Sequence, residues 1–336
     1  MDYAIVVGIN EYTPIEQDGL PTLRGAVDDA NMVEQWLLSA TGGKVPKDNC
    51  RKITSKGDRK RPLKDDIDDE LQYILEQIID KGIDANRFYF YFAGHGIGVE
   101  TNTQDTGLCL AKWSSIRRNY ALSIQKYLQL MIDLGYFKQL IFWADCCRGA
   151  LYNISPEGST IQLSANGPNA GRAGYFLGYA TQYQDPSYEA EIQPGETRGI
   201  FTEVLLSGLK GAAANENGEV DADYLRDYLF RETQRVADLT HCKQIPRSTH
   251  SFTAADPCIF HRVNNTVAVT FQFSNAAATI HLVDGSGELV QSFDTRAENP
   301  VTIQLKKGLY KLEELGNGHE DYFDVSPENP TMHVNF

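Results

Sequence analysis

A histidine and a pair of neighbouring cysteines each follow an apolar run in this 336-residue sequence. His95 comes shortly after residues 88–93, and Cys146 and Cys147 come shortly after residues 139–144. Runs that end abruptly in small and polar residues are typical of strands buried on both faces of a parallel sheet. Ligands bind beyond the carboxyl ends of such strands, so the sequence predicts that His95 and a thiol meet in one crevice.

An imidazole beside a thiol is the pair that a cysteine nucleophile needs. The imidazole lowers the pKa of the thiol and later protonates the leaving amine. Glycines at Gly94 and Gly96 let a substrate backbone approach His95 closely, and the amides of Gly96 and Cys147 could form an oxyanion hole. Alone, His95 or Cys147 would more often be a packed core residue, but together they predict an acyl-transfer site.

Several short stretches around these residues resemble the caspase and metacaspase clan, especially its prokaryotic metacaspase-like members, over about residues 1–260. The matching stretches are residues 4–10 with Tyr12, residues 23–30, residues 92–96, residues 145–149 and residues 199–202. Cys147 follows His95 by 52 positions and is followed by Arg-Gly, as is typical of caspases. The resemblance implies a cysteine endopeptidase with a His95 and Cys147 dyad. It also implies a caspase-like three-layer α/β fold, with a mainly parallel central sheet flanked by helices.

Cys146 is the competing candidate for the nucleophile. In the family pattern an acid is followed by a small residue and then by the catalytic cysteine, which implies that Cys147 is catalytic and that Cys146 fills the small-residue position. Alternation along a strand would also turn Cys146 to the opposite side. We therefore predict that Cys147 is the nucleophile.

The resemblance also implies a substrate preference. Metacaspases resemble trypsin in cleaving after Arg or Lys, and the acids that line their specificity pocket correspond here to Asp29 and Asp145. A buried carboxylate pair is tolerated if a substrate cation neutralises it. Asp185 and Glu189 are weaker candidates for the same pocket, and exposed loop carboxylates are the simpler interpretation of both.

We therefore expect a cysteine endopeptidase that cleaves protein substrates after Arg or Lys and acts as a regulated effector. Two alternatives stay open: caspase-like cleavage after Asp, and a catalytically silent scaffold. Arg148 favours the first alternative slightly, because caspases also carry Arg after the nucleophile. Intact His95 and Cys147 argue against the second.

Composition narrows the remaining classes of function. A net charge of −14 makes non-specific nucleic-acid binding improbable, because that binding depends on Lys and Arg. No apolar run is long enough for a membrane span and no basic signal peptide opens the chain, so we expect a cytoplasmic protein without membrane contacts. The six cysteines lack zinc-type spacing, and residues 215–221 only loosely suggest a calcium loop. We expect no metal and no cofactor, with the calcium dependence of some relatives left open.

Alternating strand and helix patterns predict how the site is positioned. Expected strands cover residues 3–9, 88–92, 139–145 and 175–180, and expected helices cover residues 23–38, 63–79, 124–134, 199–209 and 221–233. This order predicts a parallel sheet. The basic residues 44–64 indicate a solvated loop, with a protease-sensitive or regulatory loop as the alternative, and residues 151–172 indicate a long mobile loop.

Composition changes near residue 262. Short alternating runs follow at residues 266–273, 279–283, 289–293, 301–305, 309–312 and 322–325. They predict a peptidase domain at residues 1–262 and a small all-β sandwich at residues 263–336. The sandwich holds no cysteine and its sequence shows no catalytic cluster, so we expect it to dock an activating or partner protein.

Overall fold

The computed structural model describes most of the chain as two compact units. The described residues are 1–55, 61–149, 151–152, 154–163, 165–193, 195–263, 266–275, 277–306, 308–325 and 331–336. The first unit holds residues 1–215 and 219–262, and the second holds residues 216–218 and 263–336.

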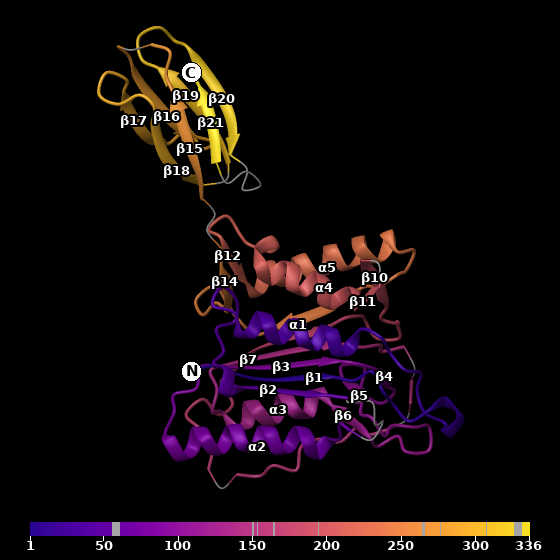
Figure 1. The fold of residues 1–336 in the computed structure, drawn as a ribbon. Helices are drawn as coiled ribbons and strands as arrows, with labels where there is room; N and C mark the ends of the chain where they lie inside the picture. The colour runs from indigo at the N-terminus through magenta and orange to yellow at the C-terminus, as the bar shows by residue number, and fades with distance from the viewer. Residues whose placement is uncertain are drawn as a thin grey trace. The chain divides into compact units, whose positions relative to one another are not determined.

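A six-stranded sheet forms the centre of the first unit, in the order β13–β9–β7–β3–β1–β2 (Figure 1). Its strands are β1 (Tyr3–Gly8), β2 (Cys50–Thr54), β3 (Arg87–Ala93), β7 (Gln139–Asp145), β9 (Gly174–Tyr179) and β13 (Arg247–His250). All neighbours run parallel except β13, which is antiparallel to β9. β1 and β3 are buried along their whole length, as expected of inner strands with both faces covered. The predicted mainly parallel α/β sheet is confirmed.

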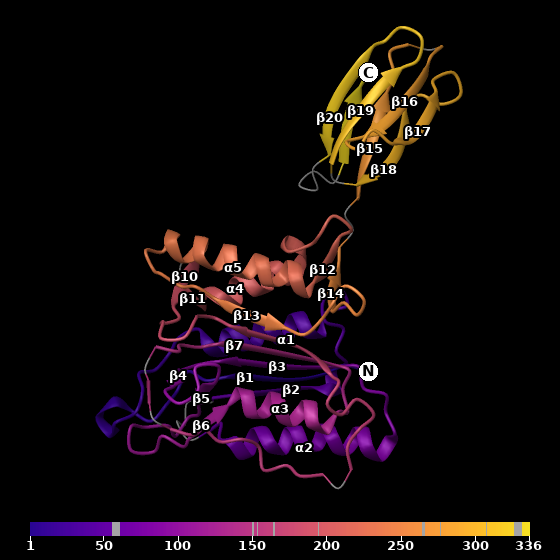
Figure 2. The ribbon, with the colours of Figure 1, turned by 180° about the vertical axis from the view of Figure 1, so that it is seen from behind.

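Helices cover both faces of this sheet and make three layers. They are α1 (Ala26–Leu38), α2 (Lys64–Lys81), α3 (Ile124–Leu134), α4 (Ile200–Ser207) and α5 (Ala222–Leu239), with short turns η1 (Ile15–Gln17), η2 (Lys47–Asn49) and η3 (Gly208–Ala212). The two opposite views show α2 and α3 on one face and α1, α4 and α5 on the other (Figures 1 and 2). The periodicity of apolar residues predicted each of these five helices, although α5 continues past the predicted end at residue 233.

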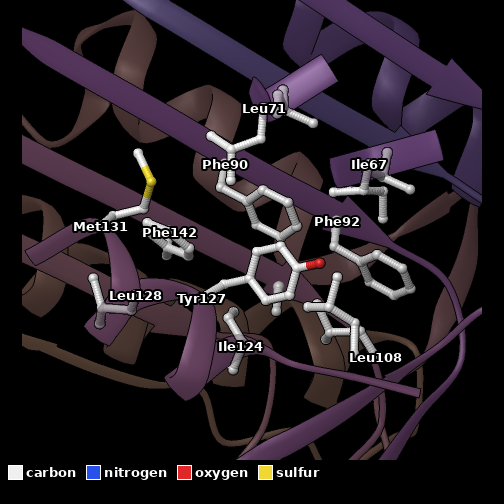
Figure 3. Close-up of a cluster of buried hydrophobic side chains, with 14 of the residues drawn as sticks. Ile67, Leu71, Phe90, Phe92, Leu108, Ile124, Tyr127, Leu128, Met131 and Phe142 are labelled. Atoms are coloured by element: carbon white, nitrogen blue, oxygen red, sulfur yellow. The ribbon is translucent and has the colours of Figure 1, made fainter. Parts of the chain in front are cut away.

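Each face of the sheet packs its own hydrophobic core. Beneath α2 and α3, Phe90 stacks on Phe142 with ring centroids 5.3 Å apart, and Leu71 and Tyr127 pack around them (Figure 3). Burying one such large side chain stabilises a fold by about 1.5–3 kcal/mol. The aromatic residues of β3 and β7 thus fix the two strands whose ends carry His95 and Cys147.

The prediction of a solvated loop at residues 44–64 is wrong in part. β2 lies within this range and pairs with β1 as the edge of the sheet. Its Arg51 and Lys52 form ion pairs with acids on α2 and α1. An edge strand with charged side chains resembles a loop in sequence. Residues 56–60 lie outside the described residues, so the regulatory alternative is not addressed by the structure.

A second, four-stranded sheet in the order β6–β5–β4–β8 was missed by sequence reasoning. Its strands are β4 (Gly96–Val99), β5 (Thr106–Cys109), β6 (Ala121–Ser123) and β8 (Leu151–Tyr152). β8 lies at the start of the predicted loop at residues 151–172, whose other described residues form no helix and no longer strand. Two antiparallel pairs, β10 (Glu189–Gln193) with β11 (Glu196–Gly199) and β12 (Glu219–Asp221) with β14 (Ile259–Arg262), were also not predicted.

The second unit consists of two sheets around a separate core, so the predicted all-β C-terminal part is confirmed. The sheets have the orders β18–β15–β21 and β17–β16–β19–β20. Their strands are β15 (Thr266–Gln272), β16 (Thr279–Asp284), β17 (Leu289–Asp294), β18 (Val301–Lys306), β19 (Gly308–Glu314), β20 (Glu320–Val325) and the unpredicted β21 (Thr331–Asn335). Within the described part of the chain, no helix is long and apolar enough to cross a membrane.

Candidate active site

His95 and Cys147 occupy equivalent positions beyond two neighbouring strands. β3 and β7 pair in parallel, from Arg87 opposite Gln139 to Ala93 opposite Asp145, so partners are always 52 positions apart. The same number separates His95 from Cys147. The amide of Gly94 continues the pairing by donating to the carbonyl of Asp145 at 3.1 Å. The spacing seen in the sequence is therefore the register of these two strands.

Gly96 allows the segments that follow β3 and β7 to come into close contact. A β-carbon at this position would overlap the carbonyl oxygen of Cys147 and would lie 2.5 Å from Sγ of Cys146. Only glycine fits such an approach of one backbone to another. The main chain of Gly96 thus lies against that of Cys147, the two residues predicted to form an oxyanion hole.

Two neighbours orient the half-buried imidazole of His95. Nε2 lies 2.8 Å from the carbonyl oxygen of Pro21, and a carbonyl only accepts, so Nε2 carries a proton. In the neutral ring this leaves Nδ1 as the basic nitrogen. On the other side, the hydroxyl of Tyr12 accepts from the His95 amide at 2.8 Å, and the two rings meet edge to face at 4.8 Å. Burial lowers the pKa of His95.

The thiol of Cys147 is half-buried and is held by Ser187. The Ser187 amide donates to Sγ at 3.2 Å, and Sγ lies 3.4 Å from the Ser187 carbonyl oxygen. Burial is the main cause that raises the pKa of Cys147. The pKa of His95 is lowered at the same time, so both shifts favour the neutral forms of the thiol and the imidazole. Cys146 instead points into the hydrophobic core and is almost fully buried.

Ser187 also connects the thiol to a buried carboxylate. Its hydroxyl donates to Oδ1 of Asp145 at 3.1 Å. Oδ2 of Asp145 accepts from the amide of Thr202 at 3.0 Å and from its hydroxyl at 2.7 Å. Desolvation nevertheless raises the pKa of Asp145. These contacts place the carboxylate next to the candidate nucleophile and hold it there.

Asp29 forms a second buried carboxylate beside Asp145. It lies in the first turn of α1, is only 2% exposed, and accepts from the Gly199 amide at 2.9 Å through Oδ2. Its Oδ1 is buried without a hydrogen-bond partner among the described residues. Burial, followed by the charge of Asp145, raises the pKa of Asp29 to about 9, and the hydrogen bond from Gly199 and the charge of Arg198 offset this only in part. The site therefore holds two acids that are costly to ionise together.

The two weaker candidates, Asp185 and Glu189, differ in position. Both are half-buried, so the interpretation as exposed loop carboxylates is wrong. Glu189 accepts from the amides of Gly25 and Arg24 at the start of α1, at 2.7 and 3.3 Å, and its charge raises the pKa of Asp29 and Asp145. Asp185 instead accepts from the side chain of nearby Gln182 at 2.7 Å. The structure thus brings Glu189, rather than the carboxylate of Asp185, into the field of the acid pair.

Arg148 is a buried residue that supports the site through contacts with other protein groups. It is 1% exposed, its guanidinium donates to the Thr106 hydroxyl at 2.7 Å and to the Thr103 carbonyl at 2.9 Å, and it lies 4.2 Å from the centre of the Tyr179 ring. Such a buried guanidinium is committed to its protein partners. It therefore anchors the segment before β5 and does not face a substrate.

Sequence reasoning missed the roles of several residues at this site. Ser187 and Pro21 act mainly through backbone atoms, which leave no signature in residue type. Tyr12 and Thr202 lie within the matching stretches, but nothing in their spacing indicated what they contact. Among the described residues, no group of three or more His, Cys, Asp or Glu side chains is arranged to hold a metal ion.

Comparisons with known proteins agree with the motifs. A family model described as "Caspase domain" matches residues 1–255. A curated relative, a "probable protease" from a Desulfuromonadales bacterium, is 31% identical over 248 residues. That match covers 68% of this chain but only 29% of the relative, so the chain spans less than a third of the relative's length.

Two solved structures also align, both at low identity and with TM-scores below 0.5. A Geobacter sulfurreducens protein aligns at 15% identity with a TM-score of 0.46, covering 78% of this chain and 97% of that one. Phospholipase PlaB from Legionella pneumophila, in complex with thio-NAD, aligns at 10% identity with a TM-score of 0.30, covering 100% and 93%.

Proposed function

The chain belongs to the caspase-domain peptidase family, and on this premise we propose that it is a cysteine endopeptidase with Cys147 as nucleophile and His95 as base. The proposal rests on the register of β3 and β7. This register places the two strand ends that precede His95 and Cys147 next to each other at the carboxyl edge of the sheet. Packing alone does not require an imidazole and a half-buried thiol at the same edge.

The proposed reaction uses the residues in fixed roles. Nδ1 of His95 takes the proton of Cys147, and the thiolate attacks the substrate carbonyl carbon. The amides of Gly96 and Cys147 would stabilise the resulting oxyanion. His95 then protonates the leaving amine, and water hydrolyses the thioester to regenerate the thiol. The hydrogen bond from Nε2 to Pro21 supports this assignment, because it favours the tautomer that has Nδ1 free to accept a proton.

We propose that cleavage follows Arg or Lys, because the acid pair Asp29 and Asp145 lies next to the nucleophile. A substrate guanidinium could pair with both carboxylates and release the proton that they hold in its absence. An Asp side chain would instead bring another carboxylate to the same place. The caspase-like alternative also loses the support of Arg148, whose guanidinium is occupied by Thr106 and Thr103.

We further propose that the second unit is a docking module and that the enzyme is a regulated effector acting on another protein. The support is that this unit has a core of its own and holds none of the candidate catalytic residues. A unit that folds around a separate core can bind a partner without disturbing the peptidase site.

Fluorogenic peptides ending in Arg, Lys or Asp before the reporter would test the proposed activity. Wild type should cleave the Arg and Lys peptides, and His95→Ala and Cys147→Ala should each lose activity by about a thousandfold or more. Equal activity in all three proteins would contradict the dyad. Preferred cleavage of the Asp peptide would contradict only the specificity. If wild type cleaved none of these peptides, the silent scaffold would become the better interpretation.

A further inference from the structure

A groove of about 800 Å³ lies in the first unit, and none of the candidate active-site residues lines it. Its walls are α5 and the segment that leads into β13. Tyr224 and Phe230 line it from α5 and are 48% and 52% exposed, which is unusual for large aromatic side chains. Half-exposed rings that line one groove are typical of surfaces that bind another chain.

The groove follows an unpaired edge of the central sheet. β13 is the last strand of the sheet, and within the described residues it pairs only with β9. The amides of Gly174 and Ala180 donate to carbonyls of β7 and of the residue just before it. Every second residue of β9, starting one position after Gly174, therefore points its backbone groups the other way, toward β13. The β13 residues opposite those alternate residues point their backbone groups toward β9. The residues between them, Ser248 and His250, therefore direct their backbone amides and carbonyls away from the sheet. Such an edge can accept a further strand.

Arginines outnumber acids in the groove, since Arg226, Arg231 and Arg247 line it together with Asp227, which pairs with Arg226. Arg231 and Arg247 line it, and in the described part of the chain neither guanidinium has a hydrogen bond or an ion pair. The protein as a whole carries a net charge of −14, so two free guanidinium groups in one groove contrast with the rest of the molecule. A hydroxyl in the same wall, Oγ of Ser248, is buried without a partner among the described residues. The groove thus offers charge, apolar surface and unused hydrogen-bonding groups together.

We propose that this groove binds an extended acidic segment of another protein, which adds to β13 as a further strand. The backbone of the segment pairs with Ser248 and His250, as in known cases of strand addition. Its apolar side chains pack on Tyr224 and Phe230, and its carboxylates pair with the two free arginines. This proposal is independent of peptidase activity.

Charge argues against a second copy of the chain as the occupant. In a two-fold arrangement β13 would pair with itself, and the cations along each edge would face the same cations of the other copy. Two molecules that each carry a net charge of −14 would also repel one another. An acidic segment meets a groove in which three arginines outnumber Asp227, whose carboxylate already pairs with Arg226.

Fluorescence anisotropy with synthetic peptides would test the proposal. The probe is a labelled peptide of about ten residues in which Glu alternates with Leu and Phe, and its matched control has Gln in place of Glu. The acidic peptide should bind Cys147→Ala protein, used to prevent cleavage, at least about tenfold more tightly than the control. A peptide N-methylated at alternate amides should bind weakly in the methylation register that blocks pairing with β13, and should bind normally in the other register. Equal binding of all these peptides would overturn the proposal.

Variants locate the binding surface. Arg231→Glu and Arg247→Glu should each weaken binding of the acidic peptide by about fivefold or more, and both together by more. Arg235→Glu is the matched control, because Arg235 is an exposed arginine on the same helix that pairs with Glu232. It should leave binding unchanged. Loss in the control alone, or no loss in the groove variants, would overturn the proposal. A stable dimer of the wild-type chain in sedimentation experiments would also overturn it, if the Arg247→Glu substitution altered that dimer.

Discussion

Asp29 and Asp145 reach the same glycine from two layers of the fold. Asp29 comes from the first turn of α1 and Asp145 from the end of β7, and a β-carbon on Gly199 would overlap Oδ2 of Asp145 and lie 2.9 Å from Oδ2 of Asp29. The glycine therefore allows both carboxylates to occupy one buried region. Since burial raises the pKa of each acid, the pair holds a proton at neutral pH unless a cation replaces it.

This relationship predicts that binding of an Arg substrate strengthens as pH rises. Below the raised pKa of Asp29, about 9, the guanidinium must displace a proton, so each unit of falling pH weakens binding by up to about tenfold. Binding of an Arg peptide to Cys147→Ala protein, measured from about pH 6 to about pH 9, should show this slope. Binding of a citrulline peptide should not show this slope with pH. Asp29→Asn should flatten the slope, whereas a flat wild-type profile would contradict the proposed role of the pair.

The same pKa predicts a change of stability with pH. In the unfolded chain Asp29 ionises near its ordinary value of 3.8, whereas in the folded protein it keeps its proton up to about 9. The folded state therefore binds more protons than the unfolded state between these values, and its stability falls as pH rises through this window. The Tm of wild type should fall relative to that of Asp29→Asn by several degrees between about pH 5 and about pH 8. A constant difference in Tm would show that Asp29 is ionised in the fold.

Much of the scaffold could be predicted from sequence, because strong periodicity survives in a large core. The apolar spacing of α2 and the aromatic runs of β3 and β7 allow few alternatives. β2 could not be recognised, since its half-buried Arg51 and its Lys52 are stabilised by acids that are distant in sequence. The strands β4, β5 and β6 are only three or four residues long, which is too short for an alternation pattern to be distinctive.

The candidate site, like the scaffold, could be predicted from the sequence only in part. The position of His95 and Cys147 just beyond two neighbouring strands could be predicted from the sequence, because their spacing equals the register of these strands. The place of Asp29 followed only from the family resemblance, since an acid in a first helical turn is normally a capping residue. The part played by Ser187 could not be predicted, because its contacts to Cys147 use backbone groups that every residue has.

The two neighbouring thiols predict opposite results on substitution. Cys147→Ser should lose cleavage of Arg peptides by about a thousandfold or more, because a hydroxyl is a far weaker nucleophile at neutral pH. Cys146→Ala should keep activity within about fivefold, with a lower Tm, because Cys146 packs in the core. Mass spectrometry after brief iodoacetamide treatment of wild type should find Cys147 modified first. Preferential modification of Cys146 and loss of activity in Cys146→Ala would reverse the assignment.

Tyr12 is predicted to position His95 without taking part in the chemistry. Tyr12→Phe keeps the ring contact but removes the hydroxyl that accepts from the His95 amide. Losing one such hydrogen bond costs about 1 kcal/mol, so kcat should fall about fivefold while KM for an Arg peptide changes little. Tyr120→Phe, at a more exposed ring, is the matched control and should behave as wild type. Equal kcat values for both variants would show that the hydroxyl does not position the imidazole.

Gly96→Ala is predicted to displace the nucleophile. The added methyl group would overlap the carbonyl of Cys147 and lie 2.5 Å from Sγ of Cys146, so the backbone after β7 must move. A displacement of about 1 Å at a reacting atom can cost about a hundredfold in rate, and we expect kcat/KM to fall by that order. Gly158→Ala is the control, because its methyl group would lie 3.3 Å from the Lys126 side chain. Near-normal activity of Gly96→Ala, with an unchanged Tm, would mean that the contact between the main chains of Gly96 and Cys147 does not align the dyad.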